Sequence, residues 1–164
     1  MKWLRRAKKV TNKLKQAQQK SLRQRALEYL GKREYSTAEL GQKLKTYADE
    51  SDDIPALLAD FKARGWLSDA RFTAQLINAR KVKFGSAKVA HELKEKGIAD
   101  DLIADAVSEI KENELEYATE VWRKKFKAVA SDRHEWAKQA RFLQSRGFGF
   151  DTIKKVLSKQ DNDD

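Results

Sequence analysis

The chain has no cysteine, one proline and two histidines among its 164 residues. Without cysteine it forms neither disulfides nor thiolate metal sites, which fits a reducing compartment. No run approaches the roughly 20 apolar residues that span a bilayer, and residues 1–6 lack the apolar region of a secretory signal. Because only one proline and seven glycines are present, little interrupts helix formation. We therefore expect a helical protein without a membrane span or disulfides.

A recognisable catalytic constellation is also lacking. His134-Glu135 has no second histidine four residues on, as a zinc protease would require, and His91 stands alone. The glycine turns at residues 84–86 and 147–149 follow no strand pattern and lack nucleotide-loop spacing. The carboxylates are numerous, but no acid–base pair stands out among them. We expect a protein that is not an enzyme and that has no cofactor and no metal.

The positive charge lies almost entirely in an N-terminal arm. The net charge is +10, yet residues 1–33 hold twelve Lys or Arg and one acid, whereas residues 34–164 hold 23 Lys or Arg and 24 acids. The body is therefore nearly neutral. The arm at 1–20 is open to three interpretations: a frayed basic tail, a segment that contacts nucleic acid, or a membrane-surface or targeting helix.

Apolar residues recur at helical spacing from residue 21 to residue 157, and no useful stretch alternates with the period of a strand. An offset of 49 or 50 residues superimposes three segments of the chain. Matching positions are Ala38, Ala87 and Ala137; Leu44, Leu93 and Leu143; and Ile54, Ile103 and Ile153. Self-similarity at this period indicates a repeat architecture. Each unit is too small to bury its apolar face alone, so neighbouring units must pack on each other.

The predicted fold is all-α, with three tandem three-helix repeats in an elongated, curved, right-handed or solenoid-like array. We expect a basic arm at 1–20, repeats at 21–67, 68–113 and 114–159, and a polar tail at 160–164. Trp136 falls on the apolar side of the second helix of the third repeat, and Phe150 on that of the third helix.

The junction between the first two repeats is the best-defined stretch, at residues 65–72. Gly65 follows a helical run as a left-handed C′ glycine would, and Ser68 is a good N-cap for the next helix. Trp66 and Phe72 would fix the angle between repeats, and a fully buried Trp66 would cost about 3–5 kcal/mol to replace with alanine. Similar corners follow at two other glycines. The expected inter-repeat structural residues are Gly65, Trp66, Phe72, Gly97 and Gly147.

Basic residues form three groups in the body of the chain. These are residues 80–83 with Lys88, residues 123–127, and Arg141 and Arg146 with Lys154 and Lys155. Each group is explained by a solvated helix face, but stacked repeats would align them into a track. Such a track would bind phosphates in a salt-sensitive, sequence-tolerant way. The tryptophans are interpreted mainly as packing residues, with Trp136 the best candidate for base stacking.

Three signatures in these stretches resemble the RecX regulatory proteins of bacteria. Residues 65–72 resemble the family's glycine–aromatic–leucine signature, which ends in Arg-Phe; residues 84–98 are similar to its second signature and residues 141–148 to its third. The resemblance runs from residue 21 to residue 157. One departure is Ser86, which stands where the family often has a proline and which we interpret as a helix cap.

This resemblance implies three tandem three-helix repeats and a regulatory function. It implies a cytoplasmic protein that binds the RecA recombinase filament along its groove and inhibits strand exchange, ATP turnover and co-protease activity. It also implies a role in DNA repair, recombination and the SOS response, with weak, salt-dependent binding of single- and double-stranded DNA. We expect a monomer. The candidate RecA or DNA contacts are Arg71, Lys81, Lys83, Lys88, Arg123, Lys124, Lys125 and Arg141.

Two other classes of function stay open from the residues themselves. A helical DNA-binding module would act like a repressor through one three-helix unit, but the neutral body lacks a strongly basic recognition helix. A protein-only helical scaffold would show no salt-dependent affinity for DNA.

Overall fold

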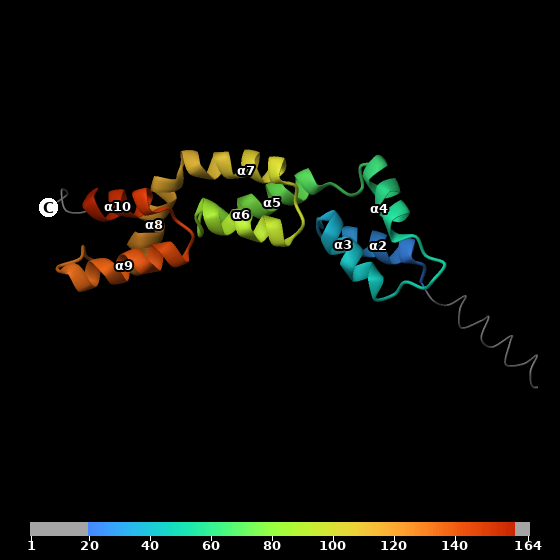
Figure 1. The fold of residues 1–164 in the computed structure, drawn as a ribbon, viewed down its shortest axis with the longest axis horizontal. Helices are drawn as coiled ribbons and strands as arrows, with labels where there is room; N and C mark the ends of the chain where they lie inside the picture. The colour runs from blue at the N-terminus through green and yellow to red at the C-terminus, as the bar shows by residue number, and fades with distance from the viewer. Residues whose placement is uncertain (1–19, 160–164) are drawn as a thin grey trace, which may run out of the picture. The chain divides into compact units, whose positions relative to one another are not determined.

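The computed structural model describes residues 20–159, and this part of the chain is all-α, as predicted (Figure 1). Residues 1–19 of the expected basic arm, and the expected tail at 160–164, lie outside the described residues. Within residues 20–159 there are nine helices and no strand, and none of these helices is long and apolar enough to cross a membrane. The helices are α2 (Leu22–Leu30), α3 (Thr37–Lys45), α4 (Ile54–Ala63), α5 (Asp69–Arg80), α6 (Ser86–Glu95), α7 (Asp100–Glu112), α8 (Glu114–Lys125), α9 (Arg133–Ser145) and α10 (Phe150–Lys159).

The chain divides into two compact units. The first holds α2, α4 and most of α3, and the second holds Ser36–Ala38, which includes the first two residues of α3, together with the helices from Ser68 onward. The core of the first unit forms around the fully buried Phe61, Leu40 and Leu44. The predicted division into repeats at 21–67, 68–113 and 114–159 is not the same partition, and it stays a prediction.

In the first unit, local sequence signals explain where the helices begin and end. Ser21 and Gln24 form a reciprocal capping box at the start of α2, and the Asp53 carboxylate caps α4 just before Pro55. After α4, Gly65 has a φ of 70°, and this left-handed turn lets the amides of Trp66 and Leu67 both donate to the Phe61 carbonyl.

Trp66 is not the fully buried residue that the sequence analysis considered. Its side chain is 42% exposed, whereas the neighbouring Leu67 is buried. The indole meets Phe61 edge-on at 5.5 Å between ring centroids, and the guanidiniums of Arg23 and Arg64 lie 5.6 and 5.2 Å from its centroid. One aromatic ring and two guanidiniums therefore border an indole that stays partly in solvent, and its replacement by alanine costs less than the 3–5 kcal/mol of a buried tryptophan.

The second unit contains two packed groups of three helices. In α5–α7 the core forms around Val89, Leu93 and Ile110, and in α8–α10 it forms around Ala118, Leu143 and Val156. Phe72 belongs to the first of these cores and is buried. These helices thus form tandem three-helix bundles, each with an apolar interior of its own.

A buried carboxylate joins these two groups. Glu114, the first residue of α8, accepts from the Ser86 amide at 2.9 Å, the Ser86 hydroxyl at 2.7 Å and the Thr152 hydroxyl at 3.0 Å. Ser86 is itself the first residue of α6, and the N-cap position is held by Gly85 without a side-chain hydrogen bond. The expectation that Ser86 caps α6 is therefore wrong: a carboxylate from α8 does so.

The same kind of carboxylate cap occurs within the second unit at Thr37, the first residue of α3. The Asp69 carboxylate of α5 accepts from the Thr37 amide at 2.7 Å and from the Thr37 hydroxyl at 3.1 Å. In both joints a left-handed glycine lies against the capped helix end: a Cβ on Gly97 would meet that of Ala38, and one on Gly147 would meet Lys88. The first residue of one helix therefore caps another helix far along the chain.

Candidate functional site

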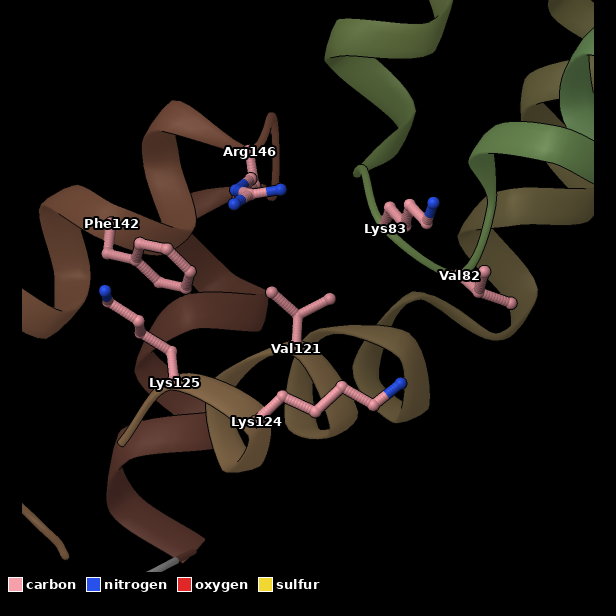
Figure 2. Close-up of a pocket in the computed structure, with 7 residues that line it drawn as sticks. All are labelled: Val82, Lys83, Val121, Lys124, Lys125, Phe142 and Arg146. Carbon is pink, nitrogen blue, oxygen red and sulfur yellow. The ribbon is translucent and has the colours of Figure 1, made fainter. Parts of the chain in front are cut away.

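A cavity of about 260 Å³ opens where the turn between α5 and α6 faces α8 and the end of α9. Four of the seven residues around it are cationic and none is acidic. We call this cavity the basic cleft (Figure 2). Its lining residues are Val82, Lys83, Val121, Lys124, Lys125, Phe142 and Arg146.

The basic cleft combines an apolar floor with cationic edges. Figure 2 shows Val121 at the centre, with Arg146, which follows α9, above it, Lys124 of α8 below it and Lys83 on the facing turn. Val121 is buried, whereas Lys83 and Lys124 are exposed. A charged ligand here would meet ammonium groups that remain in solvent while their stems border an apolar surface.

Arg146 is held in place by two aromatic rings. Its guanidinium lies 5.5 Å from the centroid of Phe84 and 5.2 Å from that of Phe142, and the Lys88 ammonium lies 4.8 Å from the Phe84 centroid. The backbone carbonyl of Arg146 accepts a hydrogen bond from the Gly85 amide at 2.8 Å. Cation–π contacts of this kind preorganise a guanidinium without neutralising it.

The cations of the cleft are not paired with acids in the part of the chain that the structure describes. Among residues 20–159, none of Lys83, Lys124 and Arg146 forms an ion pair, and the same holds for Lys125. Like charges around one cavity add their potentials and attract anions. The arrangement therefore suits a phosphate or carboxylate group.

The structure brings together three of the eight predicted contact residues. Lys83, Lys124 and Lys125 come from two basic groups 41 residues apart in the sequence and meet in the basic cleft. Arg146, which was grouped with the basic residues but not chosen as a contact, joins them. Its position in an Arg-Gly-Phe corner suggested only a structural role, although Phe142, one helical turn before it, was a usable signal.

The other five predicted contacts lie elsewhere. Lys81 pairs with Glu109 at 3.3 Å and Arg123 with Glu120 at 3.6 Å, and the Lys88 ammonium donates to the Ser145 carbonyl at 3.3 Å. Arg141 lines a different cavity, and Arg71 is exposed in the first turn of α5.

Arg80 lies near the basic cleft but is not part of its lining, because it is paired with an acid. It makes a bidentate ion pair with Glu92 of α6, with two N–O distances of 2.9 Å. The Arg80 guanidinium holds the pKa of the Glu92 carboxyl below its ordinary value, and Glu92 in turn raises the pKa of Arg80. This pair ties α5 to α6 beside the turn that carries Lys83.

Comparison with known families gives two matches along this unit. Residues 68–107 match the family model described as the second three-helix domain of RecX, and residues 112–157 match the third three-helix domain of RecX. Glu114, near the start of the second matched segment, accepts hydrogen bonds from Ser86 in the first.

Relatives and solved structures agree with these matches. The chain is 43% identical over 145 residues to the regulatory protein RecX of Leptothrix cholodnii, covering 88% of this chain and 92% of that one. It is 42% identical to the regulatory protein RecX of Herminiimonas arsenicoxydans, covering 89% and 97%. A crystal structure of RecX from Lactobacillus salivarius shares the fold with a TM-score of 0.75 at 19% identity, covering 86% of this chain and 95% of that one. The chain therefore belongs to the RecX family of regulatory proteins.

Proposed function

We propose that this protein is a non-enzymatic negative regulator of the RecA recombinase. It binds the RecA–DNA filament and inhibits the recombinase, ATPase and co-protease activities, and so modulates DNA repair and the SOS response in the cytoplasm. Family membership and the resemblance of its three signatures support this proposal. In this reading it acts as a monomer, with weak, salt-dependent affinity for single- and double-stranded DNA.

The observation that carries the proposal is the basic cleft. Four cations that form no ion pair within residues 20–159 border one cavity, and their ammonium and guanidinium groups match the phosphates of filament-bound DNA. Lys83, Lys124 and Lys125 are the contacts we place there. Arg71, Lys81, Lys88, Arg123 and Arg141 remain candidates for contacts along the filament.

Inhibition follows if the protein prefers one state of the filament. A ligand shifts an equilibrium only by the difference between its affinities for the two states. The protein would therefore bind an inactive or shortened filament more tightly than the extended, active one. No group of the protein needs to react in this mechanism.

The test measures RecA ATP hydrolysis on single-stranded DNA. We expect inhibition at fewer than one molecule of this protein per RecA protomer. A variant with Lys83→Ala and Lys124→Ala should require several-fold more protein for half inhibition. The matched control changes two exposed lysines outside the cleft, Lys94→Ala and Lys111→Ala. No inhibition by the unaltered protein, even in excess over RecA, would show that the proposed function is wrong.

A further inference from the structure

A second cavity, of about 270 Å³, lies on the surface formed by α9 and α10. Unlike the basic cleft, it is mainly apolar, with one charged residue and one amide on its wall. We call it the aromatic groove. Its lining residues are Trp136, Ala137, Ala140, Arg141, Gln144, Phe148, Phe150 and Ile153.

The aromatic groove exposes large side chains that were expected on buried faces. Phe150 is 66% exposed and Trp136 is 36% exposed, so the expectation of an apolar, packed position is wrong for Phe150 and only partly met for Trp136. Among the described residues of the second unit, the only other large exposed hydrophobic is Val82. Two neighbouring aromatics at one cavity mark an interaction site more often than an isolated exposed residue does.

The repeat shows that these aromatics are specific to the third segment. Trp136 corresponds to Ser86 and Thr37, and Phe150 corresponds to Asp100 and Ser51. Ser86 and Thr37 donate hydroxyl hydrogens to the carboxylates of Glu114 and Asp69, the caps described above. An indole cannot form that joint, so this face of the third segment is adapted to a different contact.

The charge at the groove indicates which kind of partner fits. Arg141 is exposed and forms no ion pair within residues 20–159, and Gln144 is the other polar group on the wall. A groove for single-stranded nucleic acid needs a row of cations along its aromatic platforms, and this one has a single cation. Aromatic residues with one arginine are typical of protein–protein contact sites.

We propose that the aromatic groove is a protein-docking site that takes an apolar side chain of a RecA protomer, with a neighbouring RecA carboxylate bound by Arg141. The naming of RecA rests on the proposed function. The basic cleft then contacts the DNA of the filament, and the aromatic groove contacts its protein. Binding to the filament uses both surfaces, whereas binding to bare DNA uses the basic cleft.

The test exchanges each aromatic for its counterpart in the second segment. The variant carries Trp136→Ser and Phe150→Asp, both at exposed positions, and its melting curve checks that it folds. We measure its affinity for immobilised RecA filaments on single-stranded DNA and, separately, for the same DNA alone. Filament affinity should fall at least tenfold, while affinity for bare DNA should change by less than twofold. Arg141→Glu should lower filament affinity several-fold.

Two control variants match these changes. Leu27→Ser removes another exposed apolar side chain, and Lys94→Glu reverses the charge of an exposed lysine outside the groove; both should leave filament affinity unchanged. If the unaltered protein binds filaments and the double variant binds them equally well, the docking site is wrong and the proposed function stands. If the affinity of the double variant for bare DNA falls as much as its affinity for filaments, the groove is a nucleic-acid site and the inference is overturned. If the unaltered protein does not bind filaments, both proposals fail.

Discussion

At the scale of single residues, Glu114 shows how a buried carboxylate can organise a junction. It is 8% exposed and accepts hydrogen bonds from one amide and two hydroxyls, with no cation among these partners. The α6 amide that it caps would otherwise lack a partner at a helix start. Asp69 does the same for Thr37, so the device is used twice in one chain.

We expect Glu114→Ala to lower the free energy of unfolding of the second unit by about 1–3 kcal/mol, because it leaves the buried Ser86 amide and hydroxyl without a partner. Urea unfolding followed by circular dichroism measures the change. Glu116→Ala, an exposed neighbour on α8, is the control and should change it by less than about 0.5 kcal/mol. Equal losses in the two variants would argue against the joint.

Gly65 and Gly147 allow strain and crowding to be separated. Both have positive φ, 70° and 87°, but a Cβ on Gly65 has no neighbour within 4 Å, whereas one on Gly147 would lie 2.7 Å from the Lys88 amide nitrogen. Gly65→Ala should cost about 1–2 kcal/mol from backbone strain alone. Gly147→Ala should cost roughly 2–5 kcal/mol, because overpacking adds to that strain. Denaturant unfolding of the two variants gives the comparison, and similar costs would contradict the close approach.

At the scale of helices, the Arg80–Glu92 pair holds α5 against α6. Because Arg80 lowers the pKa of Glu92 in the folded state, the pair contributes stability above the pKa of an unfolded Glu, near 4.3. That contribution is lost as the pH falls through the lower, folded pKa, since a protonated carboxyl no longer attracts the guanidinium.

We therefore expect Glu92→Gln to make the second unit less stable at pH 6 than the unaltered protein, with the difference shrinking as the pH falls below about 4. Urea midpoints measured between pH 3 and pH 6 test this. Glu95→Gln, on the same helix and exposed, is the control. Its difference in stability from the unaltered protein should change less with pH than that of Glu92→Gln. A constant difference across this range would mean that the pair does not act through its charge.

At the scale of the whole molecule, the basic cleft predicts how salt affects DNA binding. Each phosphate contact that is lost should reduce the slope of log affinity against log salt concentration by roughly one. Lys124→Ala should therefore flatten this slope by about that amount and weaken binding to unrelated sequences alike. Fluorescence anisotropy with labelled single-stranded DNA, at salt concentrations from about 50 to about 300 mM, measures this slope. Lys111→Ala should leave the slope unchanged, and a Lys124→Ala slope equal to the unaltered one would place the lysine outside the DNA contact.

The sequence alone determined the helical fold, the three-helix periodicity and the glycine corners. These depend on short-range signals: apolar spacing, caps and glycines that the structure finds at positive φ, all of which act within a few residues. The family resemblance came from the same corners, because they combine glycine, an aromatic residue and a basic residue at constrained spacing.

Only the tertiary structure decided which distant residues meet. Lys83 joins Lys124 because the turn after α5 faces α8, and Glu114 caps α6 across 28 residues. Helical periodicity says that one side of a helix is apolar, but it does not say which apolar residues a neighbour covers, so Trp66 and Phe150 were placed in packed positions and are exposed. Contacts between groups far apart in the chain depend on how whole helices pack, and no local pattern specifies that geometry.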